Sequence, residues 1–279
     1  MTTQRARRPG PSVRTRVVEH TDASEVTRED RLITEEPLEI RVRSGTLPPR
    51  RAWVTMRTPG HDFELAAGWL VNEGLAGPSS INQVAYCTDD DLAPEQEFNV
   101  VTVNVTGTTA LPHRHERSSS GSSACGVCGK DSVVEALATR AAQPWAGPRP
   151  DASVVRRLPE ALRERQTLFA RTGGVHAAGL ADELGTLSVV REDVGRHNAV
   201  DKVVGARVLA GDPAASACLV LSGRVGFELV QKAAAVGIGS IVAVGAPTSL
   251  AARLAAEAGI DLWGFTSAGR TVRYRPDPT

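Results

Sequence analysis

The feature that most constrains the fold is a regular alternation of strand and helix patterns in the last third of the chain. Apolar strand patterns occupy 186–193, 217–223, 240–247 and 261–266, and helical periodicity occupies 195–211, 226–239 and 249–260. A further strand is expected at 174–182. Strands that alternate with helices are typical of βα units, so residues 187–265 predict a largely parallel sheet in an α/β fold.

Hydrophobic patterning divides the chain into parts. Residues 36–111 combine strand alternation with one helical run, so a smaller α+β domain is expected there. Residues 1–35 are polar and lack hydrophobic periodicity, which predicts a mobile tail. Residues 112–124 are rich in serine, which predicts a flexible loop. The α/β domain is expected over 125–279, with a pair of cysteines at its start.

Composition excludes several classes of protein. Lys+Arg and Asp+Glu both number 32, so the chain lacks the broad basic surface that a non-specific nucleic-acid binder needs, and only a local basic patch stays open. No apolar run reaches the roughly 18 residues of a membrane span. Four cysteines in 279 residues are too few for a disulfide scaffold, which favours a reducing compartment. We therefore expect a cytoplasmic protein with neither a nucleic-acid nor a membrane partner.

The sharpest local motif is CGVCGK, in which Cys125 and Cys128 follow the serine-rich loop at an expected helix start. Such a pair can chelate a metal, form a disulfide, or supply one activated thiolate with a second thiol in reserve. A zinc site needs further ligands, and His113 and His115 lie on the same loop. A helix N-terminus and the neighbouring Lys130 favour a thiolate. A reactive thiol and a zinc site both stay open.

Three expected strand-to-helix turns carry small and cationic residues. They are EDVGRHN at 192–198, SGRVG at 222–226 and GAPTS at 245–249. Ser222, Gly223 and Gly245 allow a ligand to approach the backbone, and Arg196 and Arg224 can neutralise a phosphate. Because the carboxyl ends of parallel strands share an edge, we expect the turns to meet there and hold a phosphorylated or nucleotide ligand.

The segment REDVGRHNAVDK is unusually polar for a stretch between apolar runs. His197 and Asp201 are four residues apart, as are Asn198 and Lys202, so each pair shares a helix face. A solvated helix face and a functional cluster are the two interpretations. His176 lies among small apolar residues and is either a core histidine or a functional one.

These motifs, taken in order, resemble the FdhD family. The matching segments are CGVCGK, RTGGVHAAGL, REDVGRHNAVDKVVG, LSGRVGFELVQKAAAVG, and VGAPTSLA followed by LWGF. The resemblance runs from about Glu36 to the C-terminus. It implies a cytidine-deaminase-like C-terminal domain without deaminase chemistry, and a cytoplasmic sulfurtransferase needed for formate dehydrogenase activity. The implied partners are a cysteine desulfurase, formate dehydrogenase and a second copy of the chain in a homodimer.

The resemblance also implies roles for individual residues. Cys125 falls on the persulfide carrier of the family, and Cys128 on the second cysteine of the pair. The implied sulfur acceptor is the molybdenum of a bis(molybdopterin guanine dinucleotide) cofactor, for which GDP would be a surrogate ligand. No metal ligated by the chain itself is expected. The cofactor-binding segment of the family falls on Phe265, Thr266, Ser267, Ala268, Gly269 and Arg270, to which the turns add Ser222, Gly223, Arg224 and Gly245.

Two other functions stay open. A chaperone that delivers the molybdenum cofactor without moving sulfur would share the same motifs. A zinc-dependent deaminase-like hydrolase would need an H-x-E…P-C-x-x-C arrangement. Here Ala177 and Ala178 follow His176, and the cysteine pair precedes that histidine, so the deaminase signature is absent.

Overall fold

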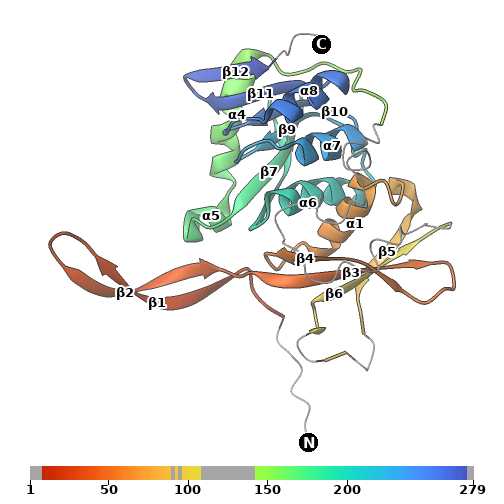
Figure 1. Ribbon diagram of the computed structural model, residues 1–279, viewed down its shortest axis with the longest axis horizontal. Helices are drawn as coiled ribbons and strands as arrows, with labels where there is room; N and C mark the ends of the chain where they lie inside the picture. The colour runs from red at the N-terminus through yellow and green to blue at the C-terminus, as the bar shows by residue number, and fades with distance from the viewer. Residues whose placement is uncertain (1–7, 89–91, 94–95, 108–141, 275–279) are drawn as a thin grey trace, which may run out of the picture.

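The computed structural model describes residues 8–88, 92–93, 96–107 and 142–274, and their arrangement is drawn in Figure 1. A six-stranded sheet with its helices lies above a four-stranded sheet in this view, and a long hairpin projects to one side. Within the described ranges, no helix is both long enough and apolar enough to cross a membrane.

The four-stranded sheet and one helix make up the smaller part. Its strands are β3 (Glu36–Ser44), β4 (Arg50–Arg57), β5 (Ile81–Tyr86) and β6 (Val100–Val105), in the order β4-β3-β6-β5, with a 3-10 turn η1 (Pro78–Ser80) before β5. Leu38 and Ile40 of β3 are fully buried against Leu70 of helix α1 (Asp62–Asn72). The strands and the helix that the sequence predicts in this region are confirmed.

The six-stranded sheet is mixed. Its strands are β7 (His176–Ala181), β8 (Leu187–Asp193), β9 (Ser216–Leu221), β10 (Ile238–Ala243), β11 (Asp261–Ser267) and β12 (Arg270–Tyr274), in the order β12-β11-β10-β9-β7-β8. β9, β10 and β11 pair in parallel, as predicted. β7 is antiparallel to β8 and β9, and β12 is antiparallel to β11, because tight turns join β7 to β8 and β11 to β12. The expected largely parallel sheet is therefore confirmed only for its central strands.

Helices cover both faces of this sheet (Figure 1). They are α4 (Ala152–Glu164) on one face, followed by the short α5 (Thr167–Thr172), and α6 (Arg196–Leu209), α7 (Phe227–Ala235) and α8 (Ser249–Glu257) on the other. β9 shows how one strand serves two cores. Leu219 and Leu221 pack under α6 to α8, whereas Cys218 and Val220 pack under α4, because successive side chains point to opposite faces.

The two sheets are joined by a close crossing of α1 and α6. A Cβ atom on Gly68 would lie 1.8 Å from the backbone oxygen of Asp201, and one on Gly205 would lie 1.8 Å from the backbone oxygen of Glu64. Only glycine allows two helix backbones to approach this closely. The smaller part therefore packs directly on the larger one.

The expected mobile tail over 1–35 is wrong for residues 12–33, which we call the arm. They form β1 (Ser12–His20) and β2 (Glu25–Ile33), which pair antiparallel along their whole length. These strands are hard to predict from the sequence, because charged residues lie on both faces of the hairpin and apolar and polar residues do not alternate regularly. The end of β2 packs on α5, and the rest of the arm projects beyond the body (Figure 1).

Candidate functional site

The carboxyl ends of β8, β9, β10 and β11 share one edge of the six-stranded sheet, because these four strands run in the same direction. The three turns singled out in the sequence follow β8, β9 and β10 at this edge. The first residue of the antiparallel β7 lies there too. We call this region the turn edge. The structure brings the three turns together, as the sequence predicts.

Hydrogen bonds join the second and third turns, the start of β7 and the β11–β12 hairpin into a row. The N–H of Gly245 donates to the oxygen of Gly223 (3.1 Å), and the N–H of Phe265 donates to the oxygen of Gly245 (3.1 Å). Ser222 Oγ accepts from the N–H of Ala177 at 2.8 Å. The predicted site residues at the ends of β9, β10 and β11 are therefore direct neighbours.

Crowding explains two glycines in this row. A Cβ atom on Gly223 would lie 3.2 Å from Nδ1 of His176. A Cβ atom on Gly245 would lie 2.9 Å from Cγ and 3.0 Å from the backbone nitrogen of Arg224. These contacts are tight enough that a side chain at either position would push its neighbour away. The two glycines thus leave the room that His176 and Arg224 occupy.

Helices α6 and α7 begin at the turn edge without side-chain caps. Their N-cap residues are Gly195 and Gly226, which have no side chain to accept a first-turn N–H. α8 differs, because Thr248 Oγ1 accepts from the N–H of Ala251 at 3.2 Å. Uncapped N–H groups at a helix start attract anions, and Arg196 adds a full positive charge in the first turn of α6. This edge is therefore suited to a phosphate group.

The segment 265–270 extends the turn edge through the hairpin between β11 and β12. Phe265 has a φ of 49°, which is uncommon for a residue other than glycine, and its side chain is 47% exposed. The guanidinium carbon of Arg270 lies 5.5 Å from the centre of that ring. Thr266 is buried, with its Oγ1 3.0 Å from Oγ1 of Thr271. The exposed residues of this hairpin are Phe265, Ser267, Ala268, Gly269 and Arg270.

Two histidines also lie at this edge. His176 is half-buried there, and its pKa is lowered first by burial and then by electrostatic interactions with Arg196 and His197. His176 is therefore neutral at neutral pH. Nε2 of His197 lies 3.0 Å from Oε2 of Glu228. The sequence motifs do not single out Glu228, although an acidic residue two positions after Gly226 is a visible signal.

The polar segment at the start of α6 is not a solvated helix face. Nζ of Lys202 lies 2.6 Å from Oδ2 of Asp193 and donates to the oxygen of Thr58 at 2.9 Å. Oδ1 of Asp201 accepts from Nζ of Lys232 at 2.8 Å. Asp193, Asp201 and Lys202 are all buried. These charges join α6 to neighbouring elements.

The predicted pair Cys125 and Cys128 lies outside the described residues, as does the serine-rich loop 112–124. Two cysteines are described. Cys218 is fully buried, and burial raises the pKa of its thiol, which makes it a poor nucleophile. Cys87 is half-buried, and Nη1 of Arg41 donates to its Sγ at 3.7 Å. Within the part of the chain that the structure describes, no group of three His, Cys, Asp or Glu residues is placed to hold a metal.

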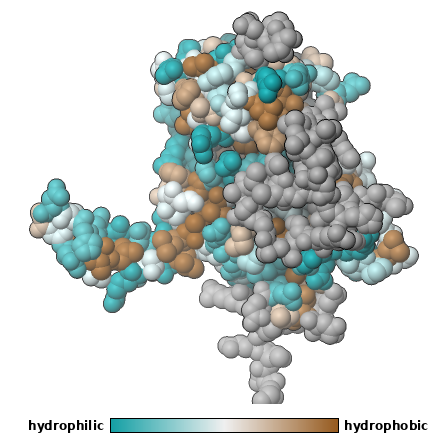
Figure 2. Space-filling view, viewed as in Figure 1, coloured by the Kyte–Doolittle hydropathy of each residue, from teal (hydrophilic) through white to brown (hydrophobic). Residues whose placement is uncertain are grey.

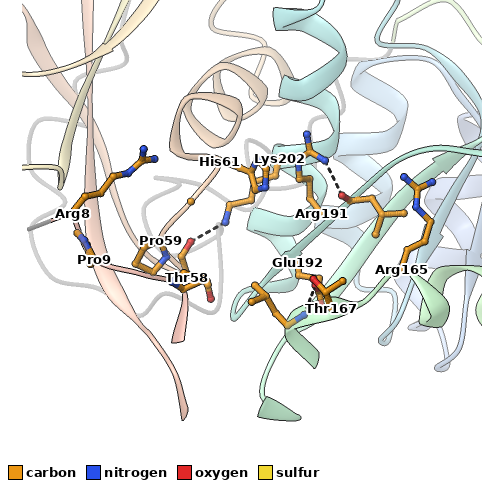
Figure 3. Close-up of a pocket in the computed structure, with 14 residues that line it drawn as sticks. Arg8, Pro9, Thr58, Pro59, His61, Arg165, Thr167, Arg191, Glu192 and Lys202 are labelled. Carbon is orange, nitrogen blue, oxygen red and sulfur yellow. Dashed lines mark hydrogen bonds between the residues drawn. The ribbon is translucent and has the colours of Figure 1, made fainter. Parts of the chain in front are cut away.

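A cavity of about 390 Å³ lies between the loop before α1 and the wall formed by β8 and α5 (Figure 3). Its wall includes Arg191, whose Nη2 donates to Oε1 of Glu64 at 2.7 Å. Nδ1 of His61 lies 3.2 Å from the same carboxylate. Glu192 accepts from the N–H groups of Leu168 and Phe169, each at 2.8 Å. No motif in the sequence predicts this cavity.

The loop at this cavity also determines where α1 begins. Aspartate is a favoured N-cap residue, but the N-cap of α1 is His61, with a φ of 58°, and not the neighbouring Asp62. Asp62 is buried and accepts from Nε of Arg57 at 2.9 Å and from the hydroxyl of Tyr86 at 2.7 Å. A buried arginine needs a carboxylate partner, which outweighs the capping preference.

Replacing Glu64 by glutamine should destabilise the protein at neutral pH. Burial raises the pKa of Glu64, but hydrogen bonds from Arg191 and His61 outweigh burial and bring this pKa to about 2. The stabilisation is thus fully present above about pH 4.5 and is lost as the pH falls toward 2. Glu64→Gln should lower the free energy of unfolding by about 1–3 kcal/mol at pH 7.

Urea denaturation of both proteins between pH 7 and pH 3 measures this effect. The difference between Glu64→Gln and the parent should narrow as the pH falls below 4.5. Glu257→Gln, on the exposed side of α8, is the matched control and should stay within about 0.5 kcal/mol. A difference that does not change with pH would contradict the assigned role of the carboxylate.

The fold and the turn edge define an α/β protein whose sheet is covered by helices on both faces. Comparison with known proteins then identifies the family of this chain. The model of the FdhD/NarQ family matches residues 33–277. The chain therefore belongs to the FdhD/NarQ family, and the resemblance noted in the sequence is confirmed.

Individual relatives agree with this assignment. The sulfur carrier protein FdhD of Corynebacterium efficiens is 46% identical over 258 residues, which cover 89% of this chain and 90% of that protein. The protein of the same name from Streptomyces coelicolor is 45% identical and covers 90% of this chain and 89% of its own length. A crystal structure described as a formate dehydrogenase accessory protein from Desulfotalea psychrophila has a TM-score of 0.72 and 23% sequence identity to this chain. The match covers 95% of this chain and 97% of the chain in that crystal structure, and it supports the fold.

Proposed function

We propose that this protein is a cytoplasmic sulfurtransferase that activates formate dehydrogenase. It accepts persulfide sulfur from a cysteine desulfurase on Cys125 and delivers it to the molybdenum of a bis(molybdopterin guanine dinucleotide) cofactor. The observation that carries this proposal is the near full-length similarity to proteins named as sulfur carriers, at 46% identity over 258 residues. We also propose that the α/β part has a cytidine-deaminase-like fold and that the protein is a homodimer.

The chemistry on the cysteine pair balances in two steps. The Cys125 thiolate attacks the terminal sulfur of the desulfurase persulfide, so a new S–S bond forms on Cys125 and the desulfurase thiolate leaves. The Cys128 thiolate then attacks the inner sulfur of Cys125. The outer sulfur leaves as sulfide for molybdenum, and a disulfide between the two cysteines remains. A dithiol reductant returns the pair to thiols.

The turn edge supports the part of the proposal that concerns the cofactor. The guanine dinucleotide ends of the cofactor carry phosphates, and uncapped helix starts at Gly195 and Gly226 are suited to them. The exposed Arg224 and Arg270 supply positive charge beside these turns. The exposed ring of Phe265 offers an apolar face for a base.

Arg270→Ala should weaken binding of GDP, used as a surrogate for the nucleotide ends of the cofactor. Loss of one charged hydrogen-bonding partner costs roughly 1.5–3 kcal/mol, which is about ten- to a hundredfold in affinity. Calorimetric titration measures this change. Sulfur loading on Cys125 should be unchanged, since Arg270 takes no part in it. GDP binding as tight as in the parent would place the nucleotide elsewhere.

Intact-mass analysis tests the sulfur-transfer proposal directly. After incubation with a cysteine desulfurase and cysteine, the protein should gain one sulfur atom that a thiol reductant removes. A protein that binds the cofactor but gains no sulfur would instead be a cofactor chaperone. That result would contradict the proposed transfer step.

A further inference from the structure

The cavity between the loop before α1 and the wall of β8 and α5 carries more positive than negative charge. Its charged lining consists of one carboxylate, that of Glu192, and the cations Arg8, Arg165, Arg191 and Lys202. Both oxygens of the carboxylate already accept backbone N–H groups at the start of α5. The lining therefore has cationic hydrogen-bond donors in excess of acceptors, which favours an anionic ligand.

Arg191 and Lys202 are each neutralised by a neighbouring carboxylate. The Arg191 guanidinium donates to both oxygens of Glu64, and Nζ of Lys202 lies 2.6 Å from Oδ2 of Asp193. Lys202 is 1% exposed, and its Nζ also donates to the oxygen of Thr58 at 2.9 Å. An ammonium group has three N–H donors, and the described residues provide no acceptor for the third. Lys202 therefore brings a buried donor to the cavity that a ligand can use.

Arg8 and Arg165 are the two cations of the lining that have no carboxylate partner among the described residues. The guanidinium carbon of Arg8 lies 5.2 Å from the centre of the Tyr86 ring, in the smaller part of the molecule. Nη1 of Arg165 donates to the oxygen of Leu187 in β8 at 2.6 Å. Figure 3 shows the two arginines on opposite sides of the cavity. The positive charge that a ligand could neutralise is therefore divided between two walls.

The cavity also has an apolar lining, to which Pro9, Leu168 and Val190 contribute. Figure 2 shows apolar surface where the arm joins the body, near α5. Apolar walls with a few charged groups are typical of sites for small organic molecules, and a volume of about 390 Å³ lies in the usual range of such sites. The cavity thus suits a short hydrocarbon chain with charged ends.

We propose that this cavity binds a small dicarboxylate. One carboxylate pairs with the guanidinium of Arg165 and the other with that of Arg8, and the third N–H of Lys202 donates to one of them. The hydrocarbon chain between the carboxylates contacts the apolar walls. Phosphate carries its charge at one point, so it does not match two cations on separate walls.

The site is separate from the predicted contacts with the cofactor. Among the described residues that line the cavity, none belongs to the second or third turn or to the segment 265–270. The cavity instead lies between the two parts of the molecule, with the loop at Thr58 on one side and β8 on the other. A bound dicarboxylate therefore holds the two parts together, and its binding does not depend on the proposed function.

Succinate, glutarate and adipate are the probes, because their different lengths report the spacing between Arg8 and Arg165. Calorimetric titration measures their affinity. A ligand that binds only the folded protein stabilises it, so the best of the three should raise Tm by about 5–10 °C at a hundred times its Kd. The monocarboxylate of equal length and inorganic phosphate should each bind at least about tenfold more weakly. GDP should leave the affinity for the dicarboxylate unchanged.

Variants of the two unpaired arginines test the assignment. Arg165→Gln and Arg8→Gln should each weaken dicarboxylate binding by about tenfold, because each removes one charged hydrogen-bonding partner. Arg171→Gln is the matched control, since Arg171 is an exposed residue of α5 outside the lining, and it should bind like the parent. The Tm of each variant without ligand verifies that it is folded.

Four outcomes would overturn the proposal. The three dicarboxylates could fail to bind at concentrations up to about 10 mM. The monocarboxylate or phosphate could bind as tightly as the best dicarboxylate. The substitutions of Arg8 and Arg165 could have no effect, or GDP could compete, which would place the dicarboxylate at the turn edge. Sulfur loading of Cys125 is measured separately by mass, so a failure here is distinguishable from a failure of the proposed function.

Discussion

Replacing Cys125 by alanine should abolish activation of formate dehydrogenase while leaving the protein folded. The sulfur has to be held as a persulfide between donor and acceptor, and only a thiolate can take it from the donor. Alanine removes that atom and changes little else. Activation is measured as formate oxidation by a dehydrogenase matured in the presence of the variant, and sulfur loading is measured by intact mass.

The other cysteines provide the controls. Cys87→Ala and Cys218→Ala should both load one sulfur, because Cys218 is fully buried and Cys87 lies in the four-stranded part of the molecule. Cys128→Ala should load sulfur on Cys125 but release it poorly. Full activation of the dehydrogenase by Cys125→Ala would refute the assignment of the carrier. Normal release by Cys128→Ala would remove the proposed resolving step.

Gly68→Ala should have the largest effect on stability. The new Cβ atom would lie 1.8 Å from the backbone oxygen of Asp201, so α1 and α6 would have to move apart. Such movement would also disturb the buried contact between Asp201 and Lys232. Overpacking of this kind costs about 3 kcal/mol or more, which corresponds to a fall in Tm of about 10 °C for a protein of this size. Calorimetry or urea denaturation measures the change.

Gly77→Ala is the matched control. Gly77 has a φ of −73°, and no atom lies within 4 Å of the position that its Cβ would occupy. Its substitution should leave the free energy of unfolding within about 0.5 kcal/mol of the parent. Gly205→Ala, on the opposite side of the crossing, should behave like Gly68→Ala. A Gly68→Ala protein as stable as the parent would mean that the helices are not held at this distance.

Local patterns were enough to predict most of the elements. The apolar runs of β9 and β10 and the periodic stretches of α6 and α8 are strong signals over short windows, and each is confirmed. The arm was missed because its strands bury little and carry charges on both faces, such as Arg14 and Arg31 on one face and Arg28 on the other. A hairpin whose apolar residues lack a core in their own chain does not produce a simple alternating pattern.

Some residues of the candidate site could be placed from the sequence, and others could not. Ser222, Gly223 and Gly245 could be placed together from sequence, because strands running in one direction end at one edge. The buried charges of α6 could not be assigned in that way. The partner of Lys202 at Thr58 lies 144 residues away, and Asn72 lies 129 residues from Asp201. Because these partners are distant in sequence, the charged residues of α6 resemble a solvated helix face in the sequence but form a buried network in the structure.

The crossing of α1 and α6 also determines which residues unfold together. Separating the two sheets would break the hydrogen bond from Asn72 to Asp201 and the one from Lys202 to the oxygen of Thr58, so buried polar groups on both sides would lose a partner. The unit of cooperativity is therefore not the α+β part or the α/β part by itself. It is the layer between them, in which α1 and α6, more than 120 residues apart in sequence, lose or keep their protection from solvent together.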